Sequence, residues 1–180
     1  TTPSAFSETF DYYCYETGET APFSMTDYGK NAAGAPMSLR CHATPPLELL
    51  ECPPLSMWDY AHFLPVGDPD CVVSLEEGAT PLVDAAHLAE KFGVHQVMLK
   101  NEMTNPTGSF KDRQVSVGIS HARELGKDTV AVVSSGNVAC AAAAYAARAG
   151  MRAVLLLHGQ AGGGKVAQAA TYGPTAVRVD

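Results

Sequence analysis

The sequence predicts an α/β fold built on a parallel sheet. From about residue 97 onward, short apolar runs that suit buried strands alternate with longer runs of helical spacing, and a glycine closes several of the helices. The strands are continuous apolar runs rather than alternating patterns, which is typical of a sheet covered by helices on both faces. A strand–helix–strand order then implies parallel pairing with right-handed crossovers.

The expected elements follow in order along the chain. The segment 1–55 has no sustained period and predicts an irregular arm or short strands. Apolar spacing predicts a helix over 84–92, ended by Gly93, and a buried strand over 97–99. The remaining predictions are helices over 109–125, 138–149 and 165–172, and strands over 129–133, 152–157 and 176–179.

Composition narrows the class of protein. The 180 residues, 46% hydrophobic and 17% charged, suit one ordinary globular domain, or one and part of another. The net charge of −7 argues against nucleic acid or an anionic membrane as the main partner. No apolar run approaches the ~20 residues of a membrane span, and the first residues lack the basic region of a signal peptide. We therefore expect a cytoplasmic protein.

Five cysteines are present without any C-x-x-C pair, an odd count that fits reduced thiols better than disulfides: Cys14, Cys41, Cys52, Cys71 and Cys140. A zinc site would require distant residues such as Cys14, Cys41, His42 and Cys52 to converge. Structural zinc sites usually show close ligand pairs, so we predict no metal site.

Residues 105–113 read Asn-Pro-Thr-Gly-Ser-Phe-Lys-Asp-Arg, and this is the motif around which we interpret the rest of the chain. Pro106 and Gly108 favour a turn, and Ser109 can cap the following helix, with Asp112 three residues later. Lys111 then falls in the first turn, where the positive end of the helix dipole favours its neutral amine. A neutral amine can attack an aldehyde. By spacing alone, a solvated surface lysine is the more common case.

A second motif, Ser134-Ser135-Gly136-Asn137, follows a strand and opens a helix. Backbone N–H groups at such a junction favour a carboxylate or phosphate, and the glycine allows close approach. Many α/β loops share this pattern, so the motif is weak by itself.

Together the two motifs resemble those of the threonine synthase family, the fold-type II enzymes that use pyridoxal 5′-phosphate. The resemblance extends over residues 57–180 and includes the loop 74–82. It implies the three-layer, parallel-sheet architecture of that fold type, incomplete here at the C-terminus. It also makes Cys14, Cys41 and Cys52 resemble the remains of a cysteine-bearing segment.

The resemblance implies roles for particular residues. Lys111 would form the Schiff base with the cofactor and act as the acid/base, and Asn137 would hydrogen-bond the ring hydroxyl. Substrate-binding candidates are Ser134, Ser135 and Gly136 for the carboxylate, with Thr80 as a further contact. Lys100 could meet an anionic group of the substrate, although a solvated lysine is equally open.

Two positions depart from the family pattern. Val138 stands where threonine is frequent, and Gln114 where glycine is common. The first departure removes a hydroxyl near the substrate, which weakens the substrate assignment but not the cofactor assignment.

The loop 159–166 has the G-x-x-x-x-G-K spacing of a nucleotide-binding loop. Val166 replaces the Ser or Thr that would bind magnesium, so we interpret this loop as a surface connection.

The implied domains are an irregular arm over 1–55, the N-terminal part of a large cofactor domain over 56–113, and a smaller α/β domain over 114–180. The implied reaction is that of a lyase converting O-phosphohomoserine to threonine and phosphate. Two alternatives stay open. One is another β-replacement or β-elimination of a serine- or threonine-like amino acid, as in a dehydratase or cysteate synthase. The other is a non-catalytic half-domain that needs a partner.

Family members are about twice as long as this chain, and their later half supplies a glycine-rich loop for the cofactor phosphate. We therefore expect the C-terminal half to come from further sequence or a second chain. The 180 residues alone should bind the cofactor weakly and turn over negligibly. A homodimer stays open.

Overall fold

The computed structural model describes residues 9–24, 29–44, 47, 55–160 and 162–179. Its main body contains a parallel sheet of order β6 (Thr129–Val133), β7 (Arg152–His158) and β8 (Thr175–Val179). Helices α4 (Asn137–Ala149) and α5 (Gly163–Ala170) connect the strands in turn. The predicted parallel α/β fold is thus confirmed. The predicted helices and strands from residue 84 onward are all present, with ends displaced by at most two residues.

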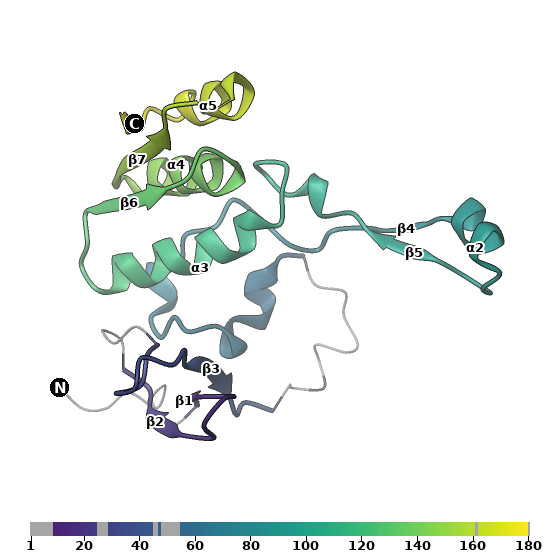
Figure 1. The fold of residues 1–180 in the computed structure, drawn as a ribbon, viewed down its shortest axis with the longest axis horizontal. Coiled ribbons are helices and arrows are strands. Elements are labelled where there is room, and N and C mark those ends of the chain that lie inside the picture. The colour runs from purple at the N-terminus through teal and green to yellow at the C-terminus, as the bar shows by residue number, and fades with distance from the viewer. Residues whose placement is uncertain (1–8, 25–28, 45–46, 48–54, 161, 180) are drawn as a thin grey trace.

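Helix α4 forms the centre of the body. It packs on β6 and β7, with α3 (Lys111–Glu124) and α5 against it (Figure 1). Most of its buried side chains are alanines, which let neighbouring helices and strands approach closely, whereas Tyr145 is large and fully buried. Along β7 the buried residues Ala153, Leu155 and Leu157 alternate with less buried ones and join this core.

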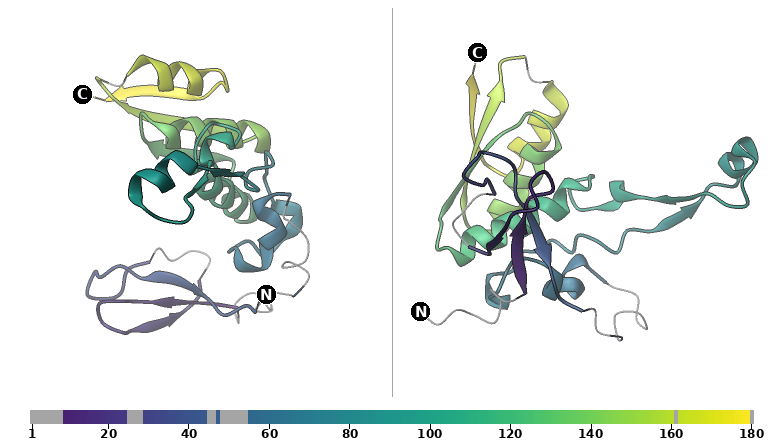
Figure 2. Two further views of the ribbon diagram at one scale, coloured as in Figure 1. Left: turned by 90° about the vertical axis from the view of Figure 1, so that its right-hand side faces the viewer. Right: turned by 60° about the horizontal axis from the view of Figure 1, so that its bottom comes forward.

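An arm projects from the body and carries β4 (Leu82–Asp84), α2 (Ala86–Phe92) and β5 (Met98–Lys100), as Figure 1 and Figure 2 show. The two strands pair antiparallel, with Val83 opposite Leu99. The prediction of a buried strand over 97–99 is wrong, because Met98 and Leu99 are 42% and 47% exposed. These strands pair only with each other in the described part of the chain, so the apolar run gains no covering layer.

The N-terminal region forms a small antiparallel sheet of order β2 (Thr20–Pro22), β1 (Phe10–Tyr13) and β3 (Ser38–Cys41). Cys41 lies opposite Phe10, whereas Cys14 follows the other end of β1, so the pairing holds these two cysteines apart. Cys52 lies outside the described residues. Within those residues no three His, Cys, Asp or Glu side chains are grouped as metal ligands would be.

Two short 3-10 helices, η2 (Met57–Phe63) and η3 (Pro69–Cys71), lead to a segment that lies along α3. Buried serines of α3 hold it at Val73. The Ser120 hydroxyl oxygen accepts from the Val73 N–H, and the Ser116 hydroxyl donates to the Val73 carbonyl, each at 2.8 Å. The helix thereby supplies the bonds that a neighbouring strand would supply.

None of the helices in the described part of the chain combines the length and the apolarity that a membrane span needs.

We expect Gly78→Ala to destabilise the fold strongly. Gly78 has φ +103°, and a Cβ there would lie 2.4 Å from the Met57 nitrogen. Gly126 is the control, since its φ is +67° but nothing lies within 4 Å of a Cβ. In urea unfolding, Gly126→Ala should lose about 1 to 2 kcal/mol through its backbone conformation alone. Gly78→Ala should lose a further 1 to 3 kcal/mol, roughly the cost of overpacking. Equal losses of unfolding free energy in the two variants would contradict the close approach of Gly78 to the Met57 backbone.

Candidate active site

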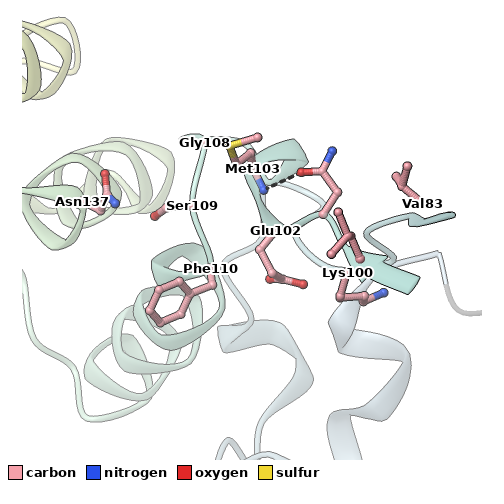
Figure 3. A pocket seen from close by; sticks show the side chains of 10 residues that line it. Val83, Lys100, Glu102, Met103, Gly108, Ser109, Phe110 and Asn137 are labelled. Atoms are coloured by element: carbon pink, nitrogen blue, oxygen red, sulfur yellow. Dashed lines mark hydrogen bonds between the residues drawn. The ribbon is translucent and has the colours of Figure 1, made fainter. Parts of the chain in front are cut away.

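A cavity of about 640 Å³ lies between the base of the arm and the first turns of α3 and α4 (Figure 3). It receives residues from β5, from η4 (Glu102–Thr104) and from the turn before α3. Its lining residues are Val83, Leu99, Lys100, Asn101, Glu102, Met103, Gly108, Ser109, Phe110 and Asn137. The volume suits a small molecule such as a cofactor with its substrate.

Asn137 is the first residue of α4 and lines this cavity. Its side-chain oxygen Oδ1 is buried and has no hydrogen-bond partner among the described residues. A buried polar atom without a partner costs about 1 to 3 kcal/mol, so a ligand that hydrogen-bonds it would recover this energy. Because an amide can be turned by 180°, Asn137 can offer either its oxygen or its nitrogen to a ring hydroxyl. This side chain therefore fits the role that the family resemblance gives it.

Lys111 is the first residue of α3, directly after two residues that line the cavity. Its ammonium lies 4.5 Å from the centroid of the Phe110 ring and 3.5 Å from Gln114 Oε1. The structure thus places Lys111 beside the cavity, with its Nζ over Phe110 rather than in the lining. The predicted first-turn position of this lysine is confirmed.

The turn before Lys111 is held differently from the prediction. Helix α3 has Phe110 at its N-cap, without a side-chain cap, and Ser109 Oγ accepts from the Lys111 N–H at 3.3 Å. The Asp112 carboxylate reaches back and accepts from the Thr107 N–H at 2.7 Å and from the Thr107 hydroxyl at 2.5 Å. Asp112 is fully buried, and this burial raises its pKa. Asp112 therefore fixes the turn that presents Lys111.

Glu102 is the centre of a polar network at the edge of the cavity. Arg113 binds both carboxylate oxygens, through Nε to Oε2 at 2.7 Å and through Nη2 to Oε1 at 2.8 Å. The Thr80 hydroxyl donates to Oε1 at 2.6 Å, and Asn105 Nδ2 donates to Oε2 at 2.9 Å. The Arg113 guanidinium is the main reason that the pKa of Glu102 falls to about 2, and Glu102 in turn raises the pKa of Arg113. The Glu102 carboxylate is thus ionised, and the Arg113 guanidinium compensates its charge.

Lys100 lies in the lining with a different environment. Its ammonium donates to the backbone carbonyl of Thr80. Among the described residues it has no ion pair, because the nearby Glu102 carboxylate is taken by Arg113. The cavity therefore contains a cation that an anionic ligand could neutralise.

The other predicted site residues lie off this lining. Thr80 is 4% exposed, and its hydroxyl is used by Glu102 and Arg113. Ser134, Ser135 and Gly136 precede α4. Ser134 Oγ accepts from the Gly136 N–H at 3.2 Å, and Ser135 lines a separate cavity of about 80 Å³ between α4, α5, β7 and β8. The structure thus brings Lys100 and Asn137 to one cavity, beside Lys111, whereas Ser134, Ser135 and Gly136 are not part of its lining.

Of the glycine loop predicted over 159–166, residues 163–166 already belong to α5. Its Lys165 ammonium donates to Gln168 Oε1 at 3.1 Å. Gln168 Nε2 donates to the Thr107 carbonyl at 2.9 Å, so α5 supports the turn before Lys111.

Sequence reasoning does not anticipate that Glu102, Asn105 and Arg113 form one network. The stretch from Glu102 to Arg113 is mostly polar, so the three residues do not stand out from their neighbours in the sequence. Their pairing depends on how the arm joins the body, which spacing along the chain does not encode.

Comparison with known proteins identifies the family. A family model described as "Pyridoxal-phosphate dependent enzyme" matches residues 73–180. The threonine synthase of Methanocaldococcus jannaschii is 44% identical over 126 residues, which cover 69% of this chain and 31% of that protein. The threonine synthase of Methanosarcina acetivorans is 49% identical over 124 residues, covering 68% and 30%. The matched part of the chain thus spans about a third of the length of these curated relatives.

Solved structures agree. Maize serine racemase superposes with a TM-score of 0.52 at 28% identity, covering 56% of this chain and 31% of that chain. O-ureido-L-serine synthase gives a TM-score of 0.51 at 31% identity, covering 56% and 32%. The matched family segment includes every residue that lines the cavity. The chain therefore belongs to the family of pyridoxal-phosphate dependent enzymes of fold type II and is similar to its threonine synthases.

Proposed function

We propose that this chain carries the Lys111 and Asn137 side of the active site of a threonine synthase, a lyase that converts O-phosphohomoserine to threonine and phosphate. The observation that supports this most is the cavity of about 640 Å³ beside the Lys111 turn. It is lined by Asn137 and Lys100, whose Oδ1 and ammonium have no hydrogen-bond partner and no counterion, respectively, among the described residues. The similarity to threonine synthases adds support.

In this proposal Lys111 holds the cofactor covalently through its Nζ. The side chain would turn from Phe110 toward the cavity, a change that a lysine with four rotatable bonds makes readily. Asn137 would hydrogen-bond the ring oxygen. When bound, the cofactor supplies an electron sink for charge that develops next to the substrate amino group. Released from the cofactor, the Lys111 amine would accept a proton from the substrate carbon that carries this amino group.

The substrate would be recognised at both ends. The backbone of Ser134, Ser135 and Gly136 leads into the N-terminus of α4, where N–H groups favour a carboxylate. Lys100 would meet the phosphate of the substrate, because its charge has no protein counterion in the described residues while Glu102 is compensated. Thr80 would act by orienting Lys100 through its carbonyl. Segments that the relatives carry beyond the matched third would bind the cofactor phosphate, whether on the same chain or on a partner.

The covalent role of Lys111 can be tested on the 180-residue chain. After incubation with pyridoxal phosphate and borohydride reduction, peptide mapping should find the pyridoxyl adduct mainly on Lys111. The turn before Lys111 holds this lysine beside the cavity. Lys91 lies on helix α2, away from the cavity, and serves as the internal control. Lys111→Ala should remove the dominant adduct. Preferential labelling of Lys91, Lys100 or Lys165 would contradict the assignment.

Asn137→Ala should have two opposite effects. Without cofactor, the protein should become more stable by about 1 to 2 kcal/mol, because a buried oxygen without a partner is removed. The cofactor should bind roughly ten- to a hundredfold more weakly, since a hydrogen bond to a charged group contributes about 1.5 to 3 kcal/mol. Thermal unfolding and a cofactor absorption titration measure the two effects. Unchanged affinity would contradict contact between Asn137 and the cofactor.

Lys100→Gln should discriminate between substrates. In the complete protein, affinity for an amino acid with a phosphate tail should fall about tenfold or more, the worth of one charge-assisted hydrogen bond. Affinity for serine, which has no anionic tail, should stay near that of the wild type, and Lys100→Arg should retain much of the phosphate affinity. Equal losses for both amino acids would show that Lys100 does not recognise the tail.

A further inference from the structure

The carboxylate of Glu77 is completely buried yet lies outside the cavity. Oε1 accepts from Trp58 Nε1 at 2.8 Å, and Oε2 accepts from the Tyr145 hydroxyl at 2.7 Å. Two further donors come from its own loop, the Leu75 N–H at 2.9 Å and the Ser74 hydroxyl at 3.2 Å. Four donors thus converge on one acceptor group. A buried carboxylate costs energy unless all of its hydrogen-bond donors stay in place.

The loop around Glu77 has an unfavourable backbone. Glu76 has φ +68° and Ala79 has φ +44°, both in the left-handed region that residues with a side chain rarely adopt, and Gly78 has φ +103°. Such conformations persist only where the surroundings over-determine them. Because Glu77 accepts two hydrogen bonds from within the loop and two from outside it, the carboxylate supplies that constraint.

The loop ends at Thr80, which touches the groups at the cavity. The Thr80 carbonyl accepts from Lys100, and its hydroxyl joins Glu102 and Arg113. Arg113 lies two residues after Lys111 in the first turn of α3. A displacement of the loop would therefore move Lys100 and the start of α3 together.

The other end of the link is helix α4. Tyr145 is fully buried and lies two turns after Asn137 on this helix. Its hydroxyl fixes α4 to the Glu77 carboxylate, and Arg148 Nε of the same helix also donates to the Ser74 carbonyl at 3.3 Å. Trp58 Nε1 also donates to Ser116 Oγ of α3 at 2.9 Å, so the same cluster contacts both helices that open at the cavity.

Only an ionised carboxylate satisfies this arrangement. Burial opposes ionisation, but hydrogen bonds from the Tyr145 hydroxyl and the Leu75 N–H contribute to lowering the pKa of Glu77. The pKa of Tyr145 is raised by burial and by the neighbouring Glu77, so the phenol stays protonated and continues to donate.

We propose that Glu77 is a positioning residue, whose carboxylate fixes the distance between the loop that carries Thr80 and the helix that carries Asn137. It sets the relative placement of Lys100 and Asn137 without touching either. The relevance of Glu77 to catalysis rests on the proposed function. The mechanical link, meaning the connection from the Thr80 loop through Glu77 to α4, does not depend on it.

Two variants and one control test this inference. Glu77→Gln places an amide N–H₂ among donors, and Tyr145→Phe removes only the hydroxyl and leaves the ring in place. Ser120→Ala is the control, because its buried hydroxyl holds Val73 and makes no bond to Glu77.

The first measurement is hydrogen exchange in the 180-residue chain without cofactor. Both variants should exchange about tenfold faster than the wild type in the segments 75–80 and 137–145, under conditions where all proteins are folded. Ser120→Ala should change neither segment by more than its overall loss of stability accounts for. If both variants show the same exchange rates in these two segments as Ser120→Ala, the inference is overturned. If Glu77→Gln does not fold, the exchange rates of Tyr145→Phe alone decide.

The second measurement uses the complete protein with pyridoxal phosphate. Tyr145→Phe should shift the cofactor absorption and raise KM for the phosphate-bearing amino acid about tenfold, whereas Ser120→Ala should lower only the unfolding temperature. Faster exchange without any spectral or KM change would refute the positioning of the site. If the wild type carries no cofactor on Lys111, the proposed function fails, and the exchange result still decides the mechanical link.

Discussion

The buried carboxylate of Glu77 joins segments that lie far apart in the sequence. Its partners Trp58, Ser74 and Tyr145 come from η2, from the loop before the arm and from α4. A charge in such a place is tolerated only because both carboxylate oxygens accept hydrogen bonds, Oε1 from one donor and Oε2 from three. These hydrogen bonds hold η2 and the loop 74–80 against α3 and α4, and the loop includes the left-handed residues Glu76 and Ala79.

Paired and unpaired polar groups have different uses in this molecule. Asp112 and the Glu102–Arg113 pair are satisfied by their neighbours and hold the turn before Lys111 and the base of the arm. Asn137 Oδ1 and the Lys100 charge lack such compensation among the described residues, and both residues line the cavity. The compensated groups therefore build the scaffold, whereas these two groups offer a ligand a hydrogen bond and a positive charge.

The sequence predicts the elements whose signals are local. The strands and helices from residue 129 onward follow from apolar runs and closing glycines such as Gly150. The Lys111 motif is equally local. The exposure of β5 could not be predicted, because a run of three apolar residues does not show whether another layer covers it. Nor could the role of Glu77, since Glu-Glu-Gly reads as a solvated turn until Tyr145 is brought beside it by the fold.

In the proposed function, the cofactor of this family lies in the cavity beside Lys111 and Asn137. The most direct measurement is a crystal structure of the complete protein grown with pyridoxal phosphate. We predict continuous density between Lys111 Nζ and the cofactor, with the Asn137 amide about 2.7 to 3.2 Å from the ring oxygen. A cofactor bound elsewhere, with Lys111 Nζ still over the Phe110 ring and Asn137 Oδ1 still unpartnered, would contradict the proposed cofactor site.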